Sequence, residues 1–154
     1  IPPTTLELTG ANTSRQHAEG LAWAMATMAF KLPEASLLYT PLRAYMKPGA
    51  LLTSDGTVTP VGLAFAICAQ GLNGAEPERQ FTNGEVRGWI FTRGDERVAF
   101  LWPTRRDQEA TLPIEAVGAV QHFSTVGQYA DLPEEETEVS IRPGANLLVG
   151  EFSL

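Results

Sequence analysis

The sequence lacks several features that would assign a protein of this size to a familiar class. Cys68 is the one cysteine, so neither an intrachain disulfide nor a cysteine-based zinc site can be built. No apolar run reaches the ~18–20 residues of a membrane span. The 11 lysines and arginines are outnumbered by 18 aspartates and glutamates, for a net charge of −7. The basic surface that binds nucleic acid is therefore absent.

Common catalytic and cofactor motifs are missing as well. The sequence contains no nucleophile elbow, no phosphate-binding loop and no dinucleotide-binding glycine pattern. Its two histidines, His17 and His122, are too far apart in sequence to form a metal motif. We therefore expect no cofactor and assign no metal ligand. The hydrophobic fraction of 44% is sufficient for a folded core.

Residues 1–76 follow an alternation of strand and helix, which is typical of α/β folds. A strand is predicted at 4–9, followed by a helix that starts after Thr13 with a capping box and stops at Pro33. A second strand is predicted at 36–40. Thr59 and Pro60 then begin a helix that runs to Leu72 and is apolar almost all round, so we expect burial on most of its circumference.

Residues 77–154 change to short strands punctuated by glycine and proline. Six strands are predicted, at 85–92, 97–102, 110–114, 117–123, 138–142 and 146–152, with a hairpin turn at 93–96. This spacing predicts an antiparallel β-sandwich. Residues 73–84 are the predicted linker, and the acidic run at 131–138 is predicted to be a solvated connection.

Glu7 is the candidate catalytic residue, because it lies near the end of a predicted strand, where α/β folds place functional groups. The alternative is a surface glutamate. Tyr39 and Tyr45 flank the loop after the second strand and are candidate cleft residues or, alternatively, loop anchors.

Aromatic residues of the second half offer a further possibility. Trp89, Trp102 and Tyr129 are of the type that stacks against sugar rings, although core packing is the better interpretation for the two tryptophans on paired strands. Cys68 lies inside an apolar helix and is predicted to be an inert core thiol.

The order of these features resembles a known family. Residues 4–18 (TTLELTGANTSRQHA) are similar to the seventh strand and following loop of retaining (β/α)₈ glycoside hydrolases, and 35–43 (ASLLYTPLR) to the eighth strand. Residues 49–64 (GALLTSDGTVTPVGLA) resemble the entry to the last barrel helix. Residues 89–102 (WIFTRGDERVAFLW) are similar to the β-sandwich appended to such barrels, and 145–150 (ANLLVG) to its last strand.

The resemblance implies an incomplete barrel end (1–76) followed by a β-sandwich (77–154). It makes Glu7 the nucleophile, and it puts the acid/base carboxylate on an earlier strand outside the chain. A full barrel takes about 250 residues, so only the last two β/α units fit here. We therefore expect the chain that begins at Ile1 to be the C-terminal end of a larger glycosidase. Its partners would be a carbohydrate and the N-terminal barrel segment, or another protein chain that supplies it.

A second hypothesis is not enzymatic. The helical half could pack on the sandwich as a module that binds glycans, or that assembles with copies of itself through the strand edge at 4–9. If the chain assembles with copies of itself, the protein would be a homo-oligomer.

Overall fold

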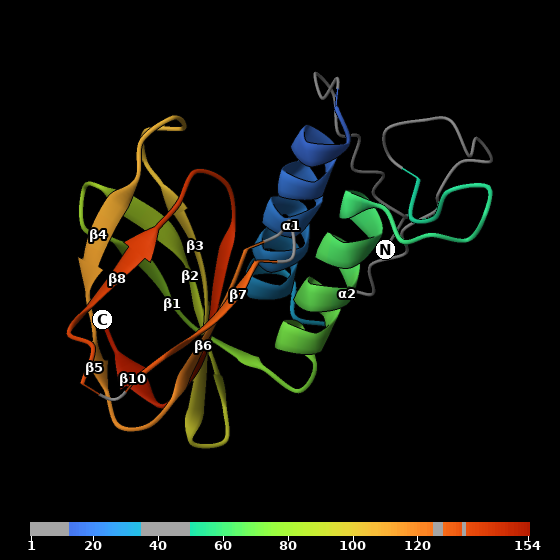
Figure 1. Cartoon of the computed structure of the whole chain (residues 1–154). Helices are drawn as coiled ribbons and strands as arrows, with labels where there is room; N and C mark the ends of the chain where they lie inside the picture. The colour runs from blue at the N-terminus through green and yellow to red at the C-terminus, as the bar shows by residue number, and fades with distance from the viewer. Residues whose placement is uncertain (1–12, 35–49, 125–127, 134) are drawn as a thin grey trace.

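The computed structural model describes residues 13–34, 50–124, 128–133 and 135–154, and in these residues it has a mixed α/β fold dominated by antiparallel sheet (Figure 1). The helices are α1 (Ser14–Lys31) and α2 (Pro60–Leu72). The strands are β1 (Glu76–Thr82), β2 (Val86–Arg93), β3 (Glu96–Pro103), β4 (Ala110–Pro113), β5 (Glu115–Ala116), β6 (Val120–Ser124), β7 (Tyr129–Leu132), β8 (Glu138–Ile141), β9 (Asn146–Gly150) and β10 (Phe152–Ser153).

Helix α1 begins and ends where the sequence predicts. Thr13 is the N-cap, and its side chain and that of Gln16 form the expected reciprocal capping box. The helix ends at Lys31, and the Leu32 amide still donates to the Met28 carbonyl in the last turn. Its alanine-rich side is buried, which lets the helix approach its neighbours closely.

Helix α2 confirms its predicted ends and is buried most deeply along one face. Thr59 caps it, Pro60 occupies the first turn, and Asn73 is the C-cap. Its buried residues are Val61, Ala64, Cys68 and Gly71, which follow the helical spacing of a single face. Full burial is confined to that face: Phe65, Ile67, Ala69 and Leu72 pack against the same core but stay half-buried, and Pro60, Ala66 and Gln70 are exposed.

Six strands form the main sheet in the order β1-β2-β3-β9-β6-β7, all antiparallel. The β2–β3 hairpin is confirmed, with Arg93 paired to Glu96 across a two-residue turn. Gly94 has φ +61° there, a value that glycine adopts at the first central position of a hairpin turn. Two smaller pairs, β4–β8 and β5–β10, complete the strands.

The main sheet is covered on both faces. Along β3, the side chains of Val98, Phe100 and Trp102 pack with the helices, whereas Ala99 and Leu101 pack with β4, β8 and β10 on the other side. The strand therefore carries an unbroken apolar run while the pleat still sorts alternate residues to opposite faces. The result is three layers: the helices, the main sheet and the small strand pairs (Figure 1).

Two strands of the main sheet are missing from the sequence prediction. Residues 73–84 are not a linker, because β1 lies within them and pairs with β2 from Glu76 to Thr82. Strand β7 likewise occupies part of the predicted acidic connection. Both are edge strands with mostly exposed side chains, and such segments are hard to distinguish from loops by composition.

The helices and the sheet share one hydrophobic core. Its members come from α1 and α2 on one side and from β2, β3 and β9 on the other. Trp89 shows the contact, because its indole Nε1 donates to Thr27 Oγ1 at 3.1 Å and its ring stacks on Phe30 with centroids 4.8 Å apart. Trp89 and Trp102 are only 5% and 8% exposed, which confirms their prediction as core residues.

Candidate functional site

The three site residues predicted from the sequence, Glu7, Tyr39 and Tyr45, lie outside the described residues, as do the strands predicted at 4–9 and 36–40. Their roles therefore stay predictions. What the structure does give is the two segments that follow them in the chain, which are the starts of α1 and α2.

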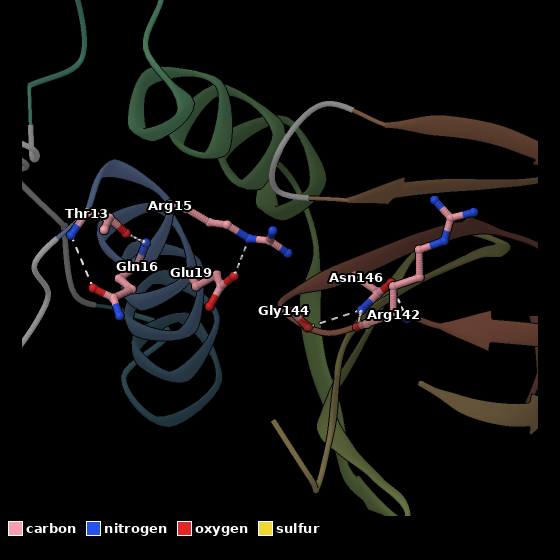
Figure 2. A network of polar contacts seen from close by, with 7 residues as sticks. All are labelled: Thr13, Arg15, Gln16, Glu19, Arg142, Gly144 and Asn146. Atoms are coloured by element: carbon pink, nitrogen blue, oxygen red, sulfur yellow. Dashed lines mark hydrogen bonds and ion pairs between the residues drawn. The ribbon is translucent and has the colours of Figure 1, made fainter. Parts of the chain in front are cut away.

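The start of α1 is fixed by its capping box (Figure 2). Thr13 Oγ1 accepts a hydrogen bond from the Gln16 amide at 3.2 Å, and Gln16 Oε1 accepts one from the Thr13 amide at 3.1 Å. One turn further on, Arg15 Nε donates to Glu19 Oε1 at 3.1 Å. This ion pair between partly exposed side chains orients the first carboxylate of the helix along its surface.

The start of α2 is held by a close backbone approach. Thr59 Oγ1 accepts from the Gly62 amide at 3.1 Å and donates to the carbonyl oxygens of Ala50 and Leu51. A Cβ on Gly62 would lie 2.2 Å from the Leu51 carbonyl oxygen, so only glycine allows the loop to pass there. The loop and the helix start therefore form one rigid corner.

Asp55 belongs to the tight turn of that same loop. The hydroxyl of Thr53 and the amide of Thr57 both donate to its carboxylate, and these hydrogen bonds hold the pKa of Asp55 below its ordinary value. A carboxylate that is stabilised in its charged form is a poor general acid. Asp55 therefore organises the turn and is a poor candidate for acid catalysis.

The two helices lie side by side and start at the same end of the molecule (Figure 1). Neither has an acidic residue in its first turn. The start of α1 follows the strand predicted at 4–9 by a short loop, and the start of α2 follows the strand predicted at 36–40 by a longer segment that contains Tyr45.

Cys68 is not placed for nucleophilic chemistry, and His17 contacts the backbone at the start of α1. Burial raises the pKa of the Cys68 thiol to about 12, which confirms the prediction of an inert core thiol. The His17 ring contacts the Thr13 carbonyl oxygen through Nδ1 at 3.1 Å, in the first turn of α1.

His122 is half-buried on β6 and contacts Asn146. Asn146 Nδ2 donates to the carbonyl oxygens of Arg142 and Gly144, at 2.8 and 3.1 Å, so Oδ1 is the atom that faces His122 (Figure 2 shows the turn). The contact therefore requires the proton of His122 on Nε2. Through its hydrogen bonds to Arg142 and Gly144, Asn146 holds the β8–β9 turn in place.

A second group of side chains lies where β6 and β7 pair. Phe123 pairs with Tyr129, and Gln121 pairs with Asp131, so these four side chains share one face of the sheet. Tyr129 was considered as a sugar-stacking residue from the sequence, and it is 51% exposed. Gln121 and Asp131 were missed, although the alternation within 121–123 and 129–131 gives their common face once the pairing is known.

Within the described part of the chain, no group of three His, Cys, Asp or Glu residues is arranged to hold a metal ion. Neither described helix combines the length and hydropathy of a membrane span.

No protein-family model and no curated protein matches the chain. Solved structures do. A family 39 glycoside hydrolase from Bacteroides cellulosilyticus WH2 matches 90% of this chain with a TM-score of 0.62 at 16% identity. A GH30 endoxylanase from Clostridium papyrosolvens C71 matches 86% with a TM-score of 0.56 at 13% identity. The gamma-CGTase of the alkalophilic Bacillus clarkii matches 94% with a TM-score of 0.53 at 13% identity.

The chain spans only part of these proteins, namely 31% of the family 39 enzyme, 38% of the endoxylanase and 24% of the gamma-CGTase. The glycoside hydrolases are matched over their C-terminal part. At these identities the likeness shows a shared fold. The described helices and antiparallel sheet thus have the fold of the C-terminal part of glycoside hydrolases.

Proposed function

We propose that this chain is the C-terminal part of a retaining (β/α)₈-barrel glycoside hydrolase that acts on a poly- or oligosaccharide. The observation that carries the proposal is the match of nearly the whole chain to the C-terminal third of two glycoside hydrolases, despite identities of 16% and 13%. In this proposal, residues 1–76 are the last two β/α units and residues 77–154 form the appended β-sandwich.

The arrangement of the helices supports this division. Two consecutive helices joined by a short turn run antiparallel, whereas α1 and α2 start at the same end (Figure 1). Parallel neighbouring helices are typical of β/α units, in which a strand returns the chain before each new helix. The strands predicted at 4–9 and 36–40 would be these returning strands.

The proposed active site lies at the end where the helices start. In (β/α)₈ barrels the functional groups sit where the strands end and the loops lead into the helices. Glu7 precedes the Thr13 cap by a short loop, and Tyr39 and Tyr45 precede α2. We assign Glu7 as the nucleophile and the two tyrosines as residues that line the sugar cleft.

The chemistry needs a second carboxylic acid about 5–5.5 Å from Glu7. The Glu7 carboxylate attacks the anomeric carbon, the bond to the leaving oxygen breaks, and the second acid protonates that oxygen. Water then attacks the glycosyl ester, its proton passes to the second carboxylate, and Glu7 is released. Among the described carboxylates of the first half, Glu19 pairs with Arg15, Glu34 is exposed after α1, and Asp55 is held in a turn. We therefore assign the acid to an earlier barrel strand.

Apolar side chains at the start of α2 support the need for a further protein segment. Leu52 and Val58 are 48% and 57% exposed on the loop that leads into the helix. Ala66, on the helix itself, is also exposed. Burying such a surface against the first six β/α units would stabilise both parts by about 25 cal/mol per Å² of apolar area removed from water.

Mechanism-based labelling tests the proposal. The protein that carries this chain is treated with 2-deoxy-2-fluoro glycosyl fluorides of glucose, xylose and mannose, which form slowly hydrolysed glycosyl esters on the nucleophile of a retaining glycosidase. We expect peptide mass spectrometry to find the added mass on Glu7. Glu7→Gln should lose both the label and roughly 10⁴-fold or more of the turnover.

Glu34→Gln is the matched control, because Glu34 is an exposed glutamate just after α1. It should keep both label and turnover. A label on another carboxylate, or turnover that persists in Glu7→Gln, would overturn the assignment of Glu7.

A further inference from the structure

Two rows of side chains cross the main sheet on the face that the helices cover. Leu147, Phe123 and Tyr129 form one row through the β9–β6 and β6–β7 pairings, and Val149, Gln121 and Asp131 form the other. Leu147 and Val149 belong to the helix-facing core, and exposure increases along both rows toward the edge strand β7. The sheet therefore extends past the helices as a platform, defined by Gln121, Phe123, Tyr129 and Asp131.

The Tyr129 ring is fixed on this platform. Its centroid lies 5.0 Å from that of Phe123 at an interplanar angle of 44°, and its hydroxyl donates to Asp131 Oδ1. The side chain nevertheless stays 51% exposed. An aromatic ring that is held at its side and at its hydroxyl offers a ligand a preorganised apolar surface, with little conformational entropy left to lose on binding.

A hollow adjoins the platform between α2 and the sheet. It holds about 310 Å³ of empty space, its open mouth included, and Gln121 and Phe123 form part of its lining. Gln70 of α2 and Arg93 at the end of β2 also line it. The guanidinium of Arg93 is itself fixed, since it donates to Glu96 Oε2 at 2.9 Å and to the Gln70 carbonyl oxygen at 3.2 Å.

We propose that the platform and the adjoining hollow bind a neutral pyranose unit of a polysaccharide. The C–H face of a sugar ring packs on an exposed aromatic ring, and its hydroxyls pair with planar carboxylate and carboxamide groups, which Asp131, Gln121 and Gln70 supply. Ligand pockets combine the same two elements, an apolar surface and a few polar groups that fix orientation.

Charge favours a neutral sugar over an anionic one. Asp131 is on the platform, Glu135, Glu136 and Glu138 follow it in sequence, and the chain carries a net charge of −7. The one cation that lines the hollow among the described residues, Arg93, is already paired with Glu96. A uronate or phosphate in the hollow would therefore find no unpaired cation among the described lining residues, and on the platform it would meet the Asp131 carboxylate.

The choice of a sugar as ligand rests on the proposed function. Besides the proposed active site around Glu7, the platform would give the strand half of the chain its own contact with the polymer. A single pyranose stacked on one tyrosine binds weakly, with Kd of about 1 mM, so the effect becomes measurable on polymers that offer many units.

Affinity electrophoresis of the protein that carries this chain tests the proposal, with xylan, starch, glucomannan or polygalacturonate in the gel. We expect at least one neutral polymer to retard the protein and polygalacturonate not to. Tyr129→Ala should weaken the retarding interaction about 10-fold, whereas Tyr129→Phe keeps the ring and most of the binding. Val117→Ala, at a side chain 75% exposed elsewhere, is the matched control and should bind normally.

Three outcomes would overturn the proposed sugar binding by the platform. They are no retardation by any neutral polymer, retardation of Tyr129→Ala equal to that of the natural protein, or stronger retardation by polygalacturonate than by the neutral polymers. Far-UV circular dichroism of the variants verifies that they are folded. Labelling of Glu7 by the fluoro-sugar is read separately, and Tyr129→Ala should keep it. Loss of polymer binding with the Glu7 label intact therefore concerns the platform alone, and loss of the label concerns the proposed function alone.

Discussion

Asn146 and His122 join two neighbouring strands through a contact of 3.0 Å between Asn146 Oδ1 and His122 Nε2. Asn146 is only 1% exposed, and its Oδ1 also accepts from the Arg142 amide at 3.2 Å. The Asn146 carboxamide thus forms hydrogen bonds with the backbone groups of the β8–β9 turn and also orients the imidazole of His122. Two predictions about stability follow from this pair.

The stability of the chain should fall below neutral pH because of His122. Burial, and secondarily the charge of Arg142, lower the pKa of His122 below its ordinary value of 6.5, and the hydrogen bond to Asn146 opposes this only in part. The unfolded chain therefore binds a proton at a higher pH than the folded chain does. The free energy of unfolding should decrease as the pH falls through about 6.5 and below, by at most about 1.4 kcal/mol per pH unit from this group.

Urea unfolding at several pH values between 7 and 5 measures the effect. His122→Gln keeps a donor toward Asn146 without titrating, so its pH dependence should be shallower than that of the natural chain. Val117→Ala, at an exposed side chain that does not titrate, should retain the natural slope. Identical slopes for the natural chain and His122→Gln would refute the prediction.

Replacing Asn146 should be costly. Asn146→Ala removes a buried side chain and leaves the carbonyl oxygens of Arg142 and Gly144 and the amide of Arg142 without their partner in a part-buried turn. We expect a loss of about 2–4 kcal/mol in the free energy of unfolding. Asn83→Ala removes two hydrogen bonds in an exposed turn and should cost about 1 kcal/mol or less. Similar losses for the two variants, measured by urea titration, would contradict the role given to Asn146.

Gly88 should not tolerate a side chain. A Cβ at this position in β2 would lie 1.9 Å from the carbonyl oxygen of Phe100, so Gly88→Ala forces two paired strands apart. We expect a loss of at least about 2 kcal/mol by thermal or urea unfolding. Gly118→Ala is the matched control, because a Cβ there meets nothing within 4 Å, and its effect should stay within about 0.5 kcal/mol. A neutral Gly88→Ala would show that the β2–β3 spacing can relax.

Cys68 should react only when the helices leave the sheet. The thiol is 1% exposed and burial raises its pKa to about 12, so the thiolate is almost absent in the folded chain at pH 8. Alkylation by iodoacetamide, followed by mass spectrometry, should be far slower than for a cysteine in unfolding concentrations of urea. The rate should rise with urea in parallel with the unfolded fraction. Rapid alkylation without denaturant would show that α2 detaches locally.

The sequence was most informative where a few neighbouring side chains determine the local backbone conformation. Thr13 with Gln16, and Thr59 with Pro60, predicted both helix starts because capping depends on neighbours in the chain. The β2–β3 hairpin followed from Gly94 and Asp95 for the same reason. Burial of Trp89 was predictable from its place on an apolar strand.

What the sequence could not predict depends on distant partners. β1 and β7 are edge strands whose polar residues pair on one side only, so nothing in their own composition distinguishes them from loops. The partial exposure of α2 depends on what lies opposite each of its faces. The platform of Tyr129 and Asp131 depends on the register of β6 against β7, and a slip of one residue would send both side chains to the other face.

Strand β3 serves two cores at once, since every residue from Val98 to Pro103 is buried and successive side chains point to opposite layers. No position in this stretch is free to change without repacking one layer or the other. Related chains should therefore diverge least here. Recombination between distant homologues should yield folded chimaeras when the crossover lies before α2 or in the turns after β3, and should fail when it divides β3 itself.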